Sequence, residues 1–265
     1  MEIFKYKPIV PVQRFLNPEN KKMYFVYNLS NDKSNYNQLK SKYSYKKNEF
    51  FTNGYSFCNV TMMGMALDYL GYIPAFKRTI ESKYPELERL PDKLAKHALE
   101  SPRVLAYYKA RFPDWYEKFE KGDKDAYGPN EIHSVLSYAV NDFLNVPCAT
   151  YFSTNTSWIE IMNELVFWGR PVGISGKFSG LNHIVLAVGC AFEDLGNDSY
   201  PSMDQKPNYF IVDDPYGKTY EYGKGLSGND VWIPFEKCVS DFKDLSDPSF
   251  KFTHRFIAPA NLGIM

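Results

Sequence analysis

Apolar residues recur at helical spacing in the segment that follows Asn53-Gly54. One face of a predicted helix is formed by Val60, Met63, Leu67 and Leu70, and Gly71 ends the pattern. Ser56 is a residue type that caps helix starts. We therefore expect a buried helix with Cys58 in its first turn, where backbone N–H groups and the positive end of the helix dipole favour a thiolate.

Several short helices are predicted between residues 76 and 145, because apolar positions there keep a loose helical spacing. The breaks between them fall at Pro85, Pro91, Pro102, Pro113 and Pro129. Nearer the N-terminus, residues 23–27 predict a strand and the polar stretch 28–48 predicts an exposed loop. Residues 1–145 are therefore expected to form a mainly helical lobe with an N-terminal extension.

The pattern changes to strands after residue 146, and predicted strands cover residues 149–152, 172–175, 182–189, 209–215 and 250–256. Thr156 or Ser157 caps a predicted helix between the first two of them. Short connections between successive strands imply antiparallel pairing. Helices followed by strands predict an α+β fold, with one domain over residues 1–265, residues 146–265 as its mainly β lobe, and a cleft between the lobes.

The charge balance and the distribution of apolar residues argue against two classes, nucleic-acid binders and membrane proteins. Lysine plus arginine and aspartate plus glutamate both number 31, so the chain has no net charge and lacks the basic surface of a nucleic-acid binder or a membrane-surface protein. No apolar run approaches the length of a membrane span, and the first residues lack the apolar core of a signal peptide. We expect a soluble cytoplasmic protein, in the host cytoplasm if a phage encodes it.

Four cysteines lie far apart in the chain, at Cys58, Cys148, Cys190 and Cys238. This spacing resembles neither a secreted disulfide framework nor a paired metal site. Reduced thiols are therefore expected, with no metal and no cofactor. The chemistry of each thiol then depends on the side chains that the fold brings next to it.

A histidine and a pair of aspartates fall at the ends of two successive predicted strands. His183 follows a glycine-containing loop over residues 176–181 and points away from the apolar side of its strand, so it is expected to face the cleft. Asp213-Asp214 ends the next strand, just before a turn. Antiparallel pairing would place the Asp214 carboxylate beside the His183 ring, where it fixes the tautomer and stabilises the imidazolium. Cys58 on a facing helix would complete the arrangement that covalent acyl transfer requires.

The order cysteine, histidine, aspartate, with the cysteine at a helix start and the other two on strands of a following sheet, resembles papain-like cysteine peptidases. More narrowly, the chain is similar to the C39-like peptidase family of bacteria and phages. The motifs that carry this resemblance are Cys58-Asn59-Val60-Thr61, Met65-Ala66-Leu67, Gly169-Arg170-Pro171-Val172, Asn182-His183-Ile184-Val185 and Val212-Asp213-Asp214-Pro215-Tyr216-Gly217. The likeness runs from about residue 53 to about residue 225 and covers residues 72–128 poorly.

The resemblance implies a papain-like fold and assigns roles to individual residues. Cys58 would be the nucleophile, His183 the general base and then the general acid, and Asp214 the orienting carboxylate. Asp213 stands where the family is expected to have asparagine, and it is the alternative orienting group.

The donor to the oxyanion is where the chain departs from the family pattern. Gln38 is the nearest glutamine before Cys58, and an insertion over residues 43–52 would return it to the site. Otherwise Asn53 or the backbone N–H of Cys58 takes this role. The chain also has Met62 where the family tends to have serine.

Together these assignments imply a thiol hydrolase that cleaves an amide or peptide bond through an acyl-enzyme. The expected substrate is a peptide or protein. A murein peptide is the alternative within the same fold, and a catalytically silent papain-like binding module is the alternative to an enzyme. A metal site of His183, Asp213 and Asp214 is disfavoured, because adjacent aspartates on a strand point to opposite faces. The oligomeric state stays open.

Overall fold

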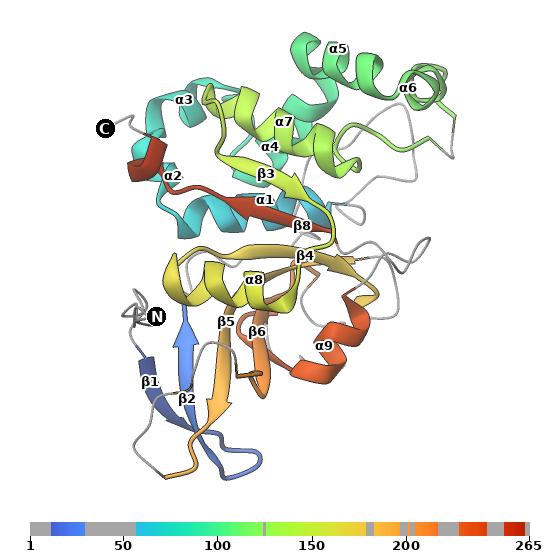
Figure 1. The fold of residues 1–265 in the computed structure, drawn as a ribbon. Helices are drawn as coiled ribbons and strands as arrows, with labels where there is room; N and C mark the ends of the chain where they lie inside the picture. Colours follow the sequence, from blue (N-terminus) through green and yellow to red (C-terminus); the bar gives the residue numbers. More distant parts are fainter. Residues whose placement is uncertain are drawn as a thin grey trace, which may run out of the picture. The chain divides into compact units, whose positions relative to one another are not determined.

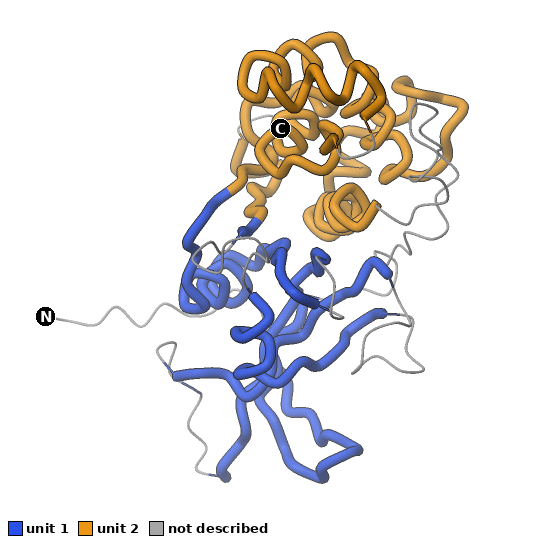
Figure 2. The backbone as a smooth tube through the Cα atoms, turned by 90° about the vertical axis from the view of Figure 1, so that its right-hand side faces the viewer, with its two compact units in different colours: residues 1–33, 153–253 blue, residues 34–152, 254–265 orange. Residues whose placement is uncertain are grey.

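The computed structural model describes residues 12–29, 57–123, 126–178, 183–196, 201, 205–216, 228–242 and 252–262. Its helices and antiparallel strands confirm the α+β class (Figure 1). The chain forms two compact units, each assembled from two separate segments (Figure 2). The sheet unit comprises residues 1–33 and 153–253, and the helical unit comprises residues 34–152 and 254–265.

The sheet unit is built around strand β5 (His183–Glu193). Its other described strands are β1 (Val12–Leu16), β2 (Met23–Asn28), β4 (Val172–Gly176), β6 (Tyr209–Asp213) and β7 (Val231–Pro234). β4 pairs with the first half of β5 and β2 with its second half, while β6 pairs with both β5 and β7. β1 pairs with β2. All of these pairings are antiparallel, as the short connections between the later strands predict.

Strand β5 is buried along nearly its whole length, and its sequence is an almost unbroken apolar run. A near-continuous apolar run is typical of a strand that is covered on both sides. Even His183, its first residue, is only 8% exposed. Gly189 lies opposite Asn28, and a Cβ atom at this position would stand 2.3 Å from the carbonyl oxygen of Tyr27. Glycine is therefore the residue type that this close strand pairing requires.

Short helices complete the sheet unit. Helix α8 (Trp158–Met162) continues into a π-helical turn over Asn163–Phe167, and α9 (Phe235–Asp241) follows β7. Ser157 caps α8, as one of the two predicted caps: its hydroxyl accepts the N–H of Glu160 at 3.3 Å, and the Glu160 carboxylate accepts the N–H of Ser157 at 2.8 Å. The apolar core of this unit includes Leu165, Val185, Val212, Phe210 and Phe235.

The helical unit contains the helices predicted between residues 76 and 145. Its helices are α1 (Cys58–Tyr69), α2 (Tyr72–Ala75), α3 (Lys77–Ser82), α4 (Leu90–Glu100), α5 (Pro102–Arg111), α6 (Pro113–Glu120) and α7 (His133–Leu144). Prolines occupy the first turns of α4, α5 and α6, where a missing backbone N–H costs nothing. Strands β3 (Thr150–Ser153) and β8 (Thr253–Phe256) are neighbours, and a 3-10 turn over Pro259–Leu262 follows them.

Helix α1 is a buried helix of the helical unit. Its residues 60–67 are all buried, which confirms the buried helix predicted from the sequence. α1 packs against α4, and α4 packs against α7. Gly71 follows α1 with a φ of 77°, in the left-handed region that glycine adopts without strain. Phe57 stands at the N-terminal cap position and makes no side-chain cap bond, while the predicted cap Ser56 lies outside the described residues.

Within the described ranges, no helix has both the length and the apolar character that crossing a membrane would need.

Candidate catalytic residues

His183 and Asp214 form a direct side-chain contact in the sheet unit. His183 begins β5, and Asp214 comes directly after the paired strand β6. The Nε2 atom of His183 lies 2.6 Å from Oδ1 of Asp214. The Asp214 carboxylate is fully buried and the His183 ring nearly so. The contact predicted from the order of the strands is therefore present, and Nε2 is the ring nitrogen that the carboxylate engages.

A tight turn after β6 fixes the Asp214 carboxylate. Its Oδ1 atom accepts the backbone N–H of Tyr216 at 2.8 Å, a bond from an aspartate to the residue two positions on. The backbone N–H of Asp214 donates to the carbonyl of Gly228 at 2.7 Å. The ring of Tyr216 meets the His183 ring edge-on, with 6.3 Å between centroids. One oxygen of Asp214 thus holds both its own turn and the imidazole.

Asp213 bonds to a different part of the sheet unit. Its Oδ1 atom accepts the backbone N–H of Asp230 at 2.8 Å, and the side chain is fully buried. Asp230 has a φ of 52° and accepts the side-chain amide of Asn28 at 3.1 Å. Asp213 therefore helps to fix the turn at Asp230, whose backbone is in the left-handed region. Neighbouring side chains on a strand point to opposite faces, which explains why Asp213 and Asp214 reach different partners.

Cys58 is the first residue of α1 in the helical unit and is partly exposed. Its Sγ atom lies 3.8 Å from Oδ1 of Asn59. The Asn59 amide nitrogen makes long bonds of 3.5 Å to the carbonyls of Asn130 and Glu131. Both carbonyls can only accept, so the amide nitrogen faces them and its oxygen faces the thiol. The loop before α7 thereby sets the side chain next to Cys58.

The other three cysteines are less suited to reaction. Burial raises the pKa of the Cys190 thiol far above its usual range. Burial also raises the pKa of Cys238 to about 12, and the nearby charge of Asp241 acts in the same direction. The pKa of the partly exposed Cys148 is likewise raised by burial. All four cysteines are free thiols, as predicted, and these three are held in the protonated form at neutral pH.

Glu131 is a further titratable group near the start of α1, and it was not predicted from the sequence. Burial raises the pKa of its carboxyl to about 7, and a 2.7 Å bond from the backbone N–H of Gly128 partly offsets this effect. The signal in the sequence is the turn of residues 128–131 before an apolar helix, which gives no indication that the carboxyl is buried.

Gln38 and Asn53, the two side chains predicted as oxyanion donors, lie outside the described residues. In the part of the chain that the structure describes, no group of three histidine, cysteine, aspartate or glutamate side chains is placed to hold a metal ion.

Comparison with protein-family models, with curated proteins and with solved structures finds no match to this chain. The chemistry of His183, Asp214 and Cys58, rather than the fold, is therefore the guide to function.

Proposed function

We propose that this protein is a thiol hydrolase of the papain-like, C39-like type, with Cys58 as the nucleophile, His183 as the general base and Asp214 as the orienting carboxylate. The observation that carries the proposal is the buried 2.6 Å contact between His183 and Asp214. A carboxylate at this distance fixes the tautomer of a neutral imidazole and stabilises the imidazolium, which is what a general base needs. The position of Cys58 at the first residue of a helix supports its role as the thiol partner.

In this mechanism the thiol proton of Cys58 passes to Nδ1 of His183, because Nε2 is the nitrogen bound to Asp214. The thiolate attacks the amide carbonyl carbon and forms a C–S bond. The C–N bond then breaks as the imidazolium gives its proton to the leaving amine. A water molecule, deprotonated by His183, hydrolyses the thioester, and the thiolate regains its proton from His183.

The proposed substrate is an amide bond in a peptide or protein. A murein peptide would be cleaved by the same steps, so these two substrates differ in recognition and share their chemistry. A papain-like module that binds without turnover is the competing proposal. The presence of a complete imidazole–carboxylate pair favours the enzyme, since a binding module has no need of an oriented base.

A cleavage assay distinguishes a peptidase, a murein hydrolase and a module that binds without turnover. The wild-type protein, Cys58→Ala and Cys148→Ala would each be incubated with a proteome-derived peptide mixture and with purified murein, and new termini would be identified by mass spectrometry. Cys148→Ala is the matched control, because Cys148 is also partly exposed and free. We expect new termini from the wild type and from Cys148→Ala, and none from Cys58→Ala. Cleavage that survives Cys58→Ala, or no cleavage of either substrate, contradicts the proposal.

A further inference from the structure

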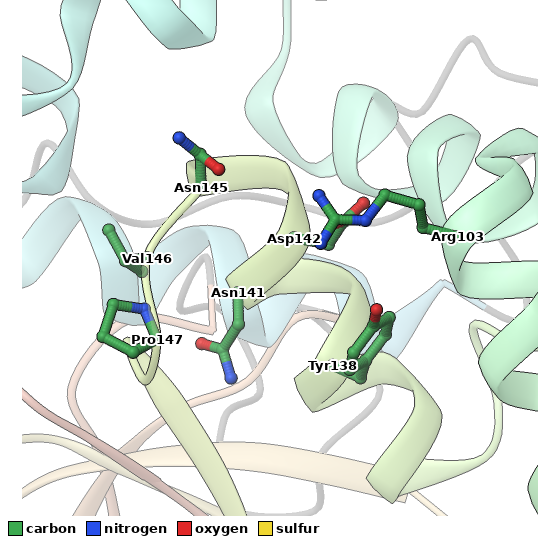
Figure 3. A pocket seen from close by; sticks show the side chains of 7 residues that line it. All are labelled: Arg103, Tyr138, Asn141, Asp142, Asn145, Val146 and Pro147. Atoms are coloured by element: carbon green, nitrogen blue, oxygen red, sulfur yellow. The ribbon is translucent and has the colours of Figure 1, made fainter.

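A cavity of about 350 Å³ lies in the helical unit, beside the C-terminal half of α7 (Figure 3). It is lined by Arg103, Tyr138, Asn141, Asp142, Asn145, Val146 and Pro147. These residues come from α5, from α7 and from the turn that follows α7, and neither Cys58 nor Asn59 is among them. We call this cavity the α7 pocket. Its size is at the lower end of the range for small-molecule sites.

Asp142 is the anchored acidic group of the α7 pocket. Its side chain is only 7% exposed, and Oδ2 lies 2.9 Å from Nε2 of His97 and 3.2 Å from Oγ of Ser101. The other ring nitrogen of His97 lies 3.1 Å from the hydroxyl of Tyr84. Because these bonds come from two other segments of the helical unit, the carboxylate has one fixed position.

Arg103 is the exposed cation at the same place, and Figure 3 shows its guanidinium group against Asp142. Its side chain is 73% exposed, and Nη1 lies 3.1 Å from Oδ1 of Asp142. This contact engages one nitrogen of a guanidinium that carries five N–H donors. An ion pair with one such exposed partner contributes little to stability. The arrangement orients Arg103 towards the pocket and leaves it able to hold an additional acceptor.

Two cations and one carboxylate lie at the α7 pocket or at the end of its helix. Arg103 and Asp142 offset each other, and the Nζ atom of Lys83 adds a cation where it donates to the carbonyls of Asp142 and Phe143. Those carbonyls belong to the last turn of α7, whose partial negative charge Lys83 neutralises. His97 adds no charge at neutral pH, because burial lowers the pKa of its imidazole. Because Lys83 is engaged by the end of the helix, Arg103 is the cation at the pocket that a ligand carboxylate would meet.

The remaining wall of the pocket combines aromatic, aliphatic and amide side chains. The Tyr138 ring is stacked on Tyr107, with 4.2 Å between centroids and 3° between planes. Asn141 uses its side chain to hold the chain after the helix, since it donates to the carbonyl of Thr150 at 2.9 Å and accepts the N–H of Ala149 at 2.7 Å. A ligand therefore meets aromatic, aliphatic and amide groups beside the ion pair of Arg103 and Asp142.

We propose that the α7 pocket binds a small carboxylate with an apolar substituent, with the carboxylate on Arg103 and the substituent against Tyr138 and Pro147. Such a carboxylate can come from the C-terminal residue of a peptide or from a free amino acid. The pocket does not depend on the thiol chemistry proposed above.

The test is an NMR titration that follows the side-chain Nε–H of Arg103 and the backbone amides of residues 145–146. The probes are N-acetyl-L-leucine, which mimics a peptide C-terminus, L-leucine, and the neutral N-acetyl-L-leucinamide. For ligands of this size we expect a Kd on the order of 1 mM for at least one acid, weakened by added salt. Tighter binding of N-acetyl-L-leucine identifies a peptide end as the ligand, and tighter binding of L-leucine identifies a free amino acid. Equal shifts with the amide, or no saturable shift with either acid, overturn the proposal.

Two arginines on the same helix allow a matched comparison. Arg103→Gln removes the cation and should weaken binding of the acid at least about tenfold, as expected for the loss of a charge-assisted hydrogen bond. Arg111→Gln removes an exposed cation from the end of α5, outside the pocket, and should leave binding unchanged. Cys58→Ala should also bind normally, so failure of the proposed hydrolase activity and failure of this site are distinguishable. Equal losses in both arginine variants contradict the assignment to Arg103.

Discussion

Asp213 and Asp214 are consecutive in the sequence but hold different parts of the sheet unit: Asp214 accepts from His183 and Tyr216, and Asp213 accepts from Asp230. Both contacts to Asp214 use the same oxygen, Oδ1. The alternation of strand side chains explains why two adjacent acids reach different partners. It also gives each acid its own test.

Asp214→Asn should lower kcat by on the order of 10⁴, because an amide in place of the orienting carboxylate lets the histidine adopt the wrong tautomer. Asp214→Ala should cost at least as much, because it also removes the acceptor for the Tyr216 N–H. Asp213→Asn should have the smallest effect on kcat, since an asparagine oxygen can still accept the N–H of Asp230. Steady-state kinetics on a cleaved peptide measures the series, with thermal unfolding as the control for folding.

If Asp213→Asn lowers kcat more than Asp214→Ala does, the orienting role belongs to Asp213. Small and equal losses in all three variants would show that neither acid orients the base.

Cys58 should be the fastest of the four thiols to react with iodoacetamide at pH 6. The pKa values of Cys148, Cys190 and Cys238 are all raised by burial, and the last two thiols are also inaccessible. His183→Ala should slow labelling of Cys58 at least about tenfold while labelling of Cys148 stays constant, because the imidazolium would no longer stabilise the thiolate. Peptide mass spectrometry reads all four sites in one sample. Faster labelling of Cys148, or no effect of His183→Ala on Cys58, would reject the pairing of this thiol with this base.

Gln38→Ala tests the oxyanion donor, which only the sequence indicates. Loss of one such donor typically lowers kcat by roughly 10² to 10³. Low-pH alkylation of Cys58 should stay nearly unchanged, because an oxyanion donor acts on the carbonyl and leaves the thiol proton alone. Asn53→Ala, measured in parallel, compares the two candidates directly. If Asn53→Ala gives the larger loss, the role passes to Asn53; if neither variant loses activity, backbone N–H groups serve alone.

Glu131 should make the protein less stable as the pH rises. Its pKa is raised from 4.5 to about 7 by burial, so the folded state keeps a proton that the unfolded state releases. The free energy of unfolding should therefore fall between about pH 4.5 and pH 7, by at most about 3 kcal/mol. Glu131→Gln keeps an acceptor for the Gly128 N–H but has no proton to lose, so this part of the decline should disappear. Urea unfolding of both proteins at pH 5, 6, 7 and 8 measures the difference, and parallel curves would show that Glu131 does not titrate there.

Helices and strands could be predicted from the sequence where the hydrophobic pattern and the capping residues agree with the packing in the structure. The apolar stripe and Gly71 predicted α1, and short apolar runs with short connections predicted β5 and its antiparallel partners. Ser157 and Glu160 form a capping box, a pattern that spans only four residues and predicts the start of α8. The contact between His183 and Asp214 followed from the pairing of two strands that are close in the sequence.

Other features depend on contacts that no local pattern encodes. β1 was not predicted because four of its five residues are exposed, so its sequence lacks a buried side. The pairing of β2 with β5 joins segments that lie far apart in the sequence. Residues 1–145 were expected in the helical lobe, whereas β1 and β2 lie in the sheet unit; residues 254–265 were expected in the β lobe and belong to the helical unit. The buried carboxyls of Glu131 and Asp142 were missed because burial of an acid depends on packing from elements far away in the sequence.

The pairing of β2 with β5 also means that β2 is synthesised well before the strand it pairs with. Tyr24 leaves the ribosome long before its partner Glu193, and translation at typical rates separates the two by roughly 10 to 30 s. During this interval the N-terminal hairpin lacks its partner strand and exposes an unpaired edge to other chains. A truncated product that ends before residue 183 retains this edge permanently, so such fragments should aggregate when they are expressed alone. A recombinant sheet unit would instead need residues 12–29 joined directly to residues 153–253. The natural gene does not encode this junction, because the helical segment lies between the two parts.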